Sequence, residues 1–81
     1  NRMKLSKKEE LLALGSALYL LGLEIEGNRA KLQKIVDQHM GVKNIPVTQE
    51  LMNSILAFEN AQHKFAQLEE KYIRLRKELQ T

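Results

Sequence analysis

Cysteine and tryptophan are absent from this chain, and it contains a single proline. Without cysteine the fold has no disulfide bond, and no thiolate is present to hold a metal ion or attack a substrate. A small chain without disulfides is typical of a reducing compartment, so we expect a cytoplasmic protein. Aromatic residues make up 5% of the chain, and they form no pattern for stacking on nucleic-acid bases.

Length and hydropathy set further limits. Eighty-one residues suffice for one domain, so we treat 1–81 as a single domain. The longest apolar run, from Leu11 to Leu23, is broken only by Ser16 and two glycines. It is shorter than the roughly 18 residues that a bilayer-spanning helix requires, so we expect no transmembrane segment. Charged residues 7–10 precede the run and no cleavage site follows it, so we expect no signal peptide.

The apolar residues follow two helical repeats separated by one short break. An α-helix repeats every 3.6 residues, so steps of three, four and seven place side chains on one stripe. The first ladder consists of Leu11, Leu14, Leu18, Leu21, Ile25, Asn28, Leu32, Ile35 and His39. The second consists of Leu51, Ile55, Phe58, Ala61, Phe65, Leu68, Tyr72, Leu75 and Leu79. The pattern predicts two long helices.

Local signals mark the ends of the first helix. Ser6 and Glu9 have the spacing of a capping box, in which each side chain bonds the backbone amide of the other residue. Gly41 suits the left-handed conformation that closes a helix, so we expect the first helix over residues 7–40. The pair Gly27-Asn28 is typical of turns. Because the ladder keeps its phase across this pair, we expect a continuous helix, with a three-helix bundle as the alternative.

Local sequence signals also mark the limits of the second helix. Pro46 forces an extended backbone before it, and Thr48 is a good N-cap. Residues 49–80 contain no glycine or proline, so we expect the second helix over that range. Folding at the break between the two helices predicts an all-α antiparallel hairpin.

One polar residue interrupts the apolar layers of this hairpin. Asn28 falls near Ala61 and Gln62 of the second helix. A buried Asn that bonds to a neighbouring Gln sets the register of paired helices at some cost in stability. The alternative is that Asn28 lies at the edge of the contact and faces water.

A second apolar stripe lies off the two ladders. A helix that is apolar on all sides is buried on all sides, and a lone hairpin covers one face of each helix. We therefore expect an interface, most simply in a homodimer that forms a four-helix bundle. The alternative is a harmless scatter of apolar surface residues. Two glycines seven residues apart, Gly15 and Gly22, lie on one flank and allow close approach of another backbone. The interface residues that we predict are Leu12, Tyr19, Leu20, Leu23, Met52 and Ile73.

The distribution of charge and the two histidines give weaker indications of function. The net charge is +3, and antiparallel folding brings basic residues of both termini to the open end of the hairpin. Such an end favours contact with phosphates or an acidic partner, but glutamates beside it also predict a solvated network of ion pairs. We do not expect nucleic acid as the partner. His39 and His63 are too few for a metal site, and no phosphate-binding loop or other cofactor motif is present.

Thr48-Gln49-Glu50-Leu51 stands at the start of the second expected helix. With the residues around it, over 25–58, it resembles the small helical-hairpin phosphatases that act on sporulation response regulators, which carry a Ser-Gln-Glu-Leu-Asp signature on their second helix. The resemblance implies activity on the aspartyl phosphate of a receiver domain. Met52 replaces the signature Asp that is expected to help hydrolysis, so the resemblance also admits an inactive relative. The other matching residues are Ile25, Glu26, Arg29, Lys31, Leu32, Gly41, Ile55 and Phe58.

The residues together predict a non-enzymatic regulatory module. We expect it to associate with itself, or to bind a partner helix, through its second apolar stripe. An aspartyl-phosphate phosphatase is the first alternative, and a weak nucleic-acid binder that uses the basic open end is the second.

Overall fold

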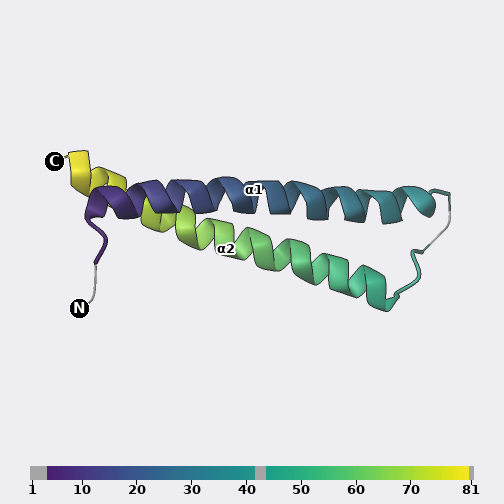
Figure 1. Cartoon of the computed structure of the whole chain (residues 1–81). Helices are drawn as coiled ribbons and strands as arrows, with labels where there is room; N and C mark the ends of the chain where they lie inside the picture. Colours follow the sequence, from purple (N-terminus) through teal and green to yellow (C-terminus); the bar gives the residue numbers. More distant parts are fainter. Residues whose placement is uncertain (1–3, 42–43, 81) are drawn as a thin grey trace.

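The chain forms an antiparallel pair of long helices. The computed structural model describes residues 4–41 and 44–80, and within them the helices are α1, Lys7–Gln38, and α2, Gln49–Gln80. Figure 1 shows α1 and α2 running in opposite directions, with both termini at one end. This confirms the all-α hairpin and the range expected for the second helix.

The predicted capping box begins α1. The Ser6 backbone N–H donates to Glu9 Oε1 at 2.9 Å, and the Glu9 backbone N–H donates to Ser6 Oγ at 3.1 Å. These bonds give partners to two backbone N–H groups at the start of the helix, which would otherwise bond only to water. The Ser6 backbone N–H and then its side chain lower the pKa of the Glu9 carboxyl, because both favour the charged form.

Helix α1 is continuous through Gly27-Asn28, which excludes the three-helix alternative within the described residues. Arg29 Nη2 lies 3.2 Å from Glu26 Oε1 across this point of the helix. Both side chains are exposed, so the pair adds little stability. Continuity follows from the ladder on either side, whose contacts with α2 outweigh the helix cost of one glycine, about 1 kcal/mol.

The first helix ends two residues earlier than the expected 7–40. His39 is the C-cap, with φ −115° and ψ 19°, and its backbone N–H donates to Val36 O at 3.0 Å. This bond spans three residues instead of four, so the chain tightens and leaves the α-helix. Gly41 has φ 87°, the left-handed conformation for which a glycine was expected there.

The N-terminus of α2 is also capped as predicted. Thr48 Oγ1 accepts a hydrogen bond of 3.1 Å from the Leu51 backbone N–H. Inside the first turn, Gln49 Nε2 donates to Asn53 Oδ1 at 2.9 Å. The cap satisfies an amide that has no partner within the helix.

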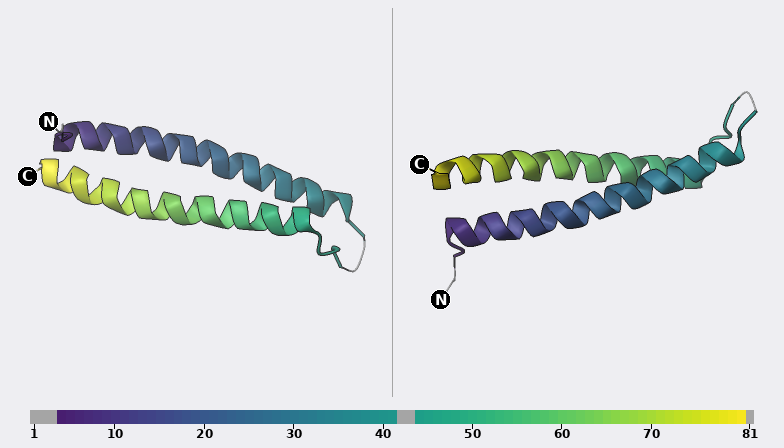
Figure 2. Two further views of the ribbon diagram at one scale, coloured as in Figure 1. Left: turned by 60° about the horizontal axis from the view of Figure 1, so that its bottom comes forward. Right: turned by 90° about the horizontal axis from the view of Figure 1, so that it is seen from above.

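The helices cross instead of running strictly side by side. They separate toward the loop in Figure 1, and toward the termini in Figures 2 (right) and 3. Ala61 is 1% exposed, and its small side chain lets the two backbones come close at the contact. Among residues 4–41 and 44–80, the buried side chains are those of Leu14, Ala61 and Leu75. The molecule measures 56 × 30 × 14 Å, too thin for a larger interior.

Asn28 is neither a buried residue bonded to Gln62 nor a fully exposed residue at the edge of the contact. Its side chain is half-buried and forms no hydrogen bond with any described residue, so the proposed bond to Gln62 is absent. Within the described part of the chain, no buried side-chain nitrogen or oxygen lacks a hydrogen-bond partner. Water therefore reaches the Asn28 amide at the edge of the helix contact.

Candidate functional site

A cluster of exposed apolar side chains covers the outer face of the first half of α1. These residues are adjacent on the helix surface, at spacings of three, four and seven. Large apolar side chains rarely gather on a free surface without a binding role. We call this cluster the α1 patch; it consists of Leu12 (66% exposed), Tyr19 (68%), Leu20 (63%) and Leu23 (54%).

The α1 patch lies on the side of α1 turned away from α2. Leu14, two positions from Leu12, is 8% exposed, and the half-buried Leu18, Leu21 and Ile25 share its face. Successive ladder positions therefore point toward α2, while the patch positions lie about half a turn of the helix away from them. The same segment of α1 is apolar on two opposite sides, and α2 covers one of them.

A shallow groove runs along one margin of the patch. Four patch and ladder residues of α1 line it together with Gly15, Ser16 and a residue of α2, Tyr72. A Cβ atom added at Gly15 would lie 3.6 Å from the Tyr72 ring, an ordinary van der Waals distance. The Tyr72 ring therefore already covers Gly15 within the hairpin. Tyr72 belongs to the predicted ladder of α2, and its ring reaches across to α1 at the margin of the patch.

Gly22 differs from Gly15. A Cβ atom added at Gly22 would meet nothing within 4 Å, so this flank of α1 is open. Of the two glycines predicted to allow close packing, Gly22 is the one that remains available to another chain.

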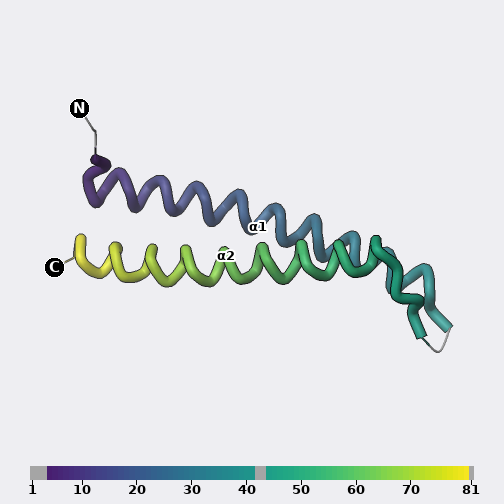
Figure 3. The backbone as a smooth tube through the Cα atoms, turned by 90° about the horizontal axis from the view of Figure 1, so that it is seen from below, coloured from purple at the N-terminus to yellow at the C-terminus, as the bar shows by residue number. Residues whose placement is uncertain are grey.

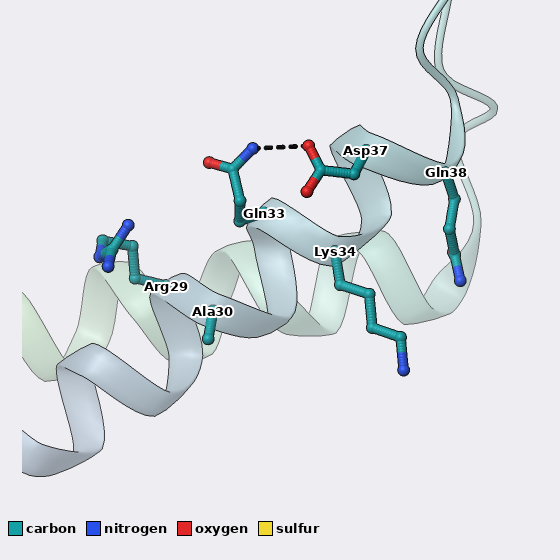
Figure 4. Close-up of a pocket in the computed structure, with 6 residues that line it drawn as sticks. All are labelled: Arg29, Ala30, Gln33, Lys34, Asp37 and Gln38. Carbon is teal, nitrogen blue, oxygen red and sulfur yellow. Dashed lines mark hydrogen bonds between the residues drawn. The ribbon is translucent and has the colours of Figure 1, made fainter.

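The apolar character of the outer face ends after Leu23. Further along the same side of α1, a surface hollow is lined by polar and charged residues with a single alanine (Figure 4). Gln33 Nε2 donates to Asp37 Oδ1 at 2.9 Å, the bond drawn in Figure 4. The residues that line the hollow are Arg29, Ala30, Gln33, Lys34, Asp37 and Gln38. Because these side chains are exposed to water, the apolar surface of the α1 patch ends before them.

The two predicted interface residues of α2 do not line the groove at the margin of the α1 patch. Met52 is 42% exposed and Ile73 is 45% exposed, so both are accessible. They lie about 31 Å apart along α2, at 1.5 Å per residue. Met52 is in the first turn of α2, near the loop, whereas the patch occupies the half of α1 near the termini (Figure 1). Ile73 borders a separate hollow with Arg76, Lys77 and Gln80.

The charged open end is held by ion pairs between the helices. Lys7 Nζ lies 2.9 Å from Glu78 Oε1, and Lys71 Nζ lies 4.0 Å from Glu10 Oε2. All four side chains are at least 40% exposed, so solvent screens both pairs. Two of the basic groups that could meet a phosphate therefore already have acidic neighbours.

The signature residues of the phosphatase resemblance lie at the other end of the hairpin. Gln49 and Glu50 are exposed in the first turn of α2, and Glu50 shares a surface hollow with Lys31 and Lys34 of α1. His39 is occupied by a contact of 2.8 Å between its Nδ1 and Ile35 O. Within residues 4–41 and 44–80, no three His, Asp or Glu side chains gather as a metal site would require.

Comparison with protein-family models, with curated proteins and with solved structures finds no match to this chain. No helix in the described part of the chain has the length and apolar character needed to cross a membrane.

Proposed function

We propose that this protein is a non-enzymatic interaction module, which associates with itself or binds a partner helix through the α1 patch. The observation that supports the proposal most strongly is the exposure of Tyr19 and Leu20, at 68% and 63%, outside the face of α1 that packs on α2. An amphipathic helix has one apolar face, and here α1 has two.

The driving force would be removal of the patch from water. Burying a leucine side chain fully is worth about 1.5–3 kcal/mol, and each patch residue now keeps more than half of its surface in water. The hairpin itself has little interior to stabilise it, with Leu14, Ala61 and Leu75 as its buried residues within the described ranges. A partner on the outer face of α1 would place residues 11–23 between two apolar surfaces and so stabilise the hairpin also.

The arrangement of charge supports an apolar mode of binding over an electrostatic one. Lys7 and Lys71 pair with glutamates at the open end, and the α1 patch itself contains no charged residue. We expect association to persist in high salt, because apolar burial is not screened as exposed charge pairs are. Loss of association on adding salt would favour the basic open end instead.

The test compares two variants with the same chemistry at different places. Replacing both Leu20 and Leu23 by Ser removes the centre of the α1 patch. Leu56→Ser is the control, because Leu56 is also 50% exposed but lies on α2. Sedimentation over a range of concentrations should show association for the unmodified chain and for the Leu56→Ser variant, and a monomer for the double variant. Circular dichroism checks that all three remain helical.

If the unmodified chain sediments as a monomer throughout, the same variants are used as baits in an extract of the source cells. A partner retained by the unmodified chain and by Leu56→Ser, and lost by the double variant, supports binding through the patch. Identical behaviour of the double variant and the unmodified chain in both measurements would refute the proposal.

A further inference from the structure

We draw no further inference here: the strongest candidate, the apolar surface that the α1 patch forms with the shallow groove beside Tyr72, belongs to the site already described, and nothing in the structure shows what covers it.

Discussion

Replacing Leu14 or Leu12 by alanine should affect stability very differently, although the two residues lie within one turn of α1. Leu14 is 8% exposed and packs toward α2, whereas Leu12 is 66% exposed on the outer face. The two substitutions remove the same atoms from the same helix and change its intrinsic helix propensity equally. Any difference between them therefore measures what each side of α1 contacts.

The expected magnitudes follow from burial. Leu→Ala in a protein core costs about 2–5 kcal/mol, and the cost grows with the cavity that remains. This contact is two helices thick and open at its edges, so neighbouring side chains and water can fill the space at Leu14. We expect a loss of about 2–3 kcal/mol for Leu14→Ala, the lower part of that range. For Leu12→Ala in the monomer we expect a change within about 0.5 kcal/mol, as for exposed positions generally.

Urea unfolding followed by far-ultraviolet circular dichroism measures both effects. It should be carried out at one protein concentration below the onset of association and at another above it. Leu14→Ala should lower the free energy of unfolding at both concentrations. Leu12→Ala should lower it only at the higher concentration, where the α1 patch is covered and, in a two-fold dimer, each substitution acts twice.

Two results would refute this reasoning. Equal losses for Leu12→Ala and Leu14→Ala at the lower concentration would mean that the two faces of α1 are assigned wrongly. A change below about 0.5 kcal/mol for Leu14→Ala would mean that α1 does not pack on α2 through its ladder.

Four further predictions concern the start of α1, the flank of α1 and the crossing of the helices. Ser6→Ala should destabilise the hairpin by about 1 kcal/mol in thermal unfolding, because it removes the N-cap of α1. The folded-state pKa of Glu9 lies below its ordinary value of 4.5. The stability that the Glu9 carboxylate contributes should therefore be present above pH 4.5 and be lost as the pH falls through the lowered pKa. An NMR titration of the Glu9 carboxyl that gave an ordinary pKa would contradict this. Gly22→Ala and Gly27→Ala should each stabilise the monomer by about 1 kcal/mol, since neither added Cβ meets an atom within 4 Å. Sedimentation should show weaker association for Gly22→Ala than for Gly27→Ala. Equal association of the two variants would mean that the flank of Gly22 stays free in the dimer. Ala61→Leu should cost about 1–3 kcal/mol in urea unfolding, because the helices have no space for a larger side chain where Ala61 is 1% exposed; an unchanged midpoint would show that the crossing adapts.

The ends of the helices could be predicted from sequence because their causes are local. The Ser6–Glu9 capping box and the Thr48 cap involve residues three positions apart, and both bonds are present. The break around Pro46 and the uninterrupted range Gln49–Gln80 were likewise predicted correctly. The end of α1 was predicted two residues late, since Gly41 indicates that a helix closes but does not set how many residues of the last turn tighten before it.

The arrangement of the apolar faces required the tertiary structure. Sequence periodicity identified two apolar stripes on α1, but it contains no information on which residues of α2 lie beside each stripe. It also treated Gly15 and Gly22 alike, although only Gly15 lies against Tyr72. These assignments depend on which residues of α2 come opposite each turn of α1, and that is a property of the pair.

The sequence by itself therefore determined that this protein consists of two capped helices with more apolar surface than a hairpin can cover. The tertiary structure decided how much of that surface stays in water. Packing α2 against the Leu14 face of α1 exposes Leu12, Tyr19 and Leu20 on the opposite side, because a helix in contact with one neighbour can bury only one of its faces.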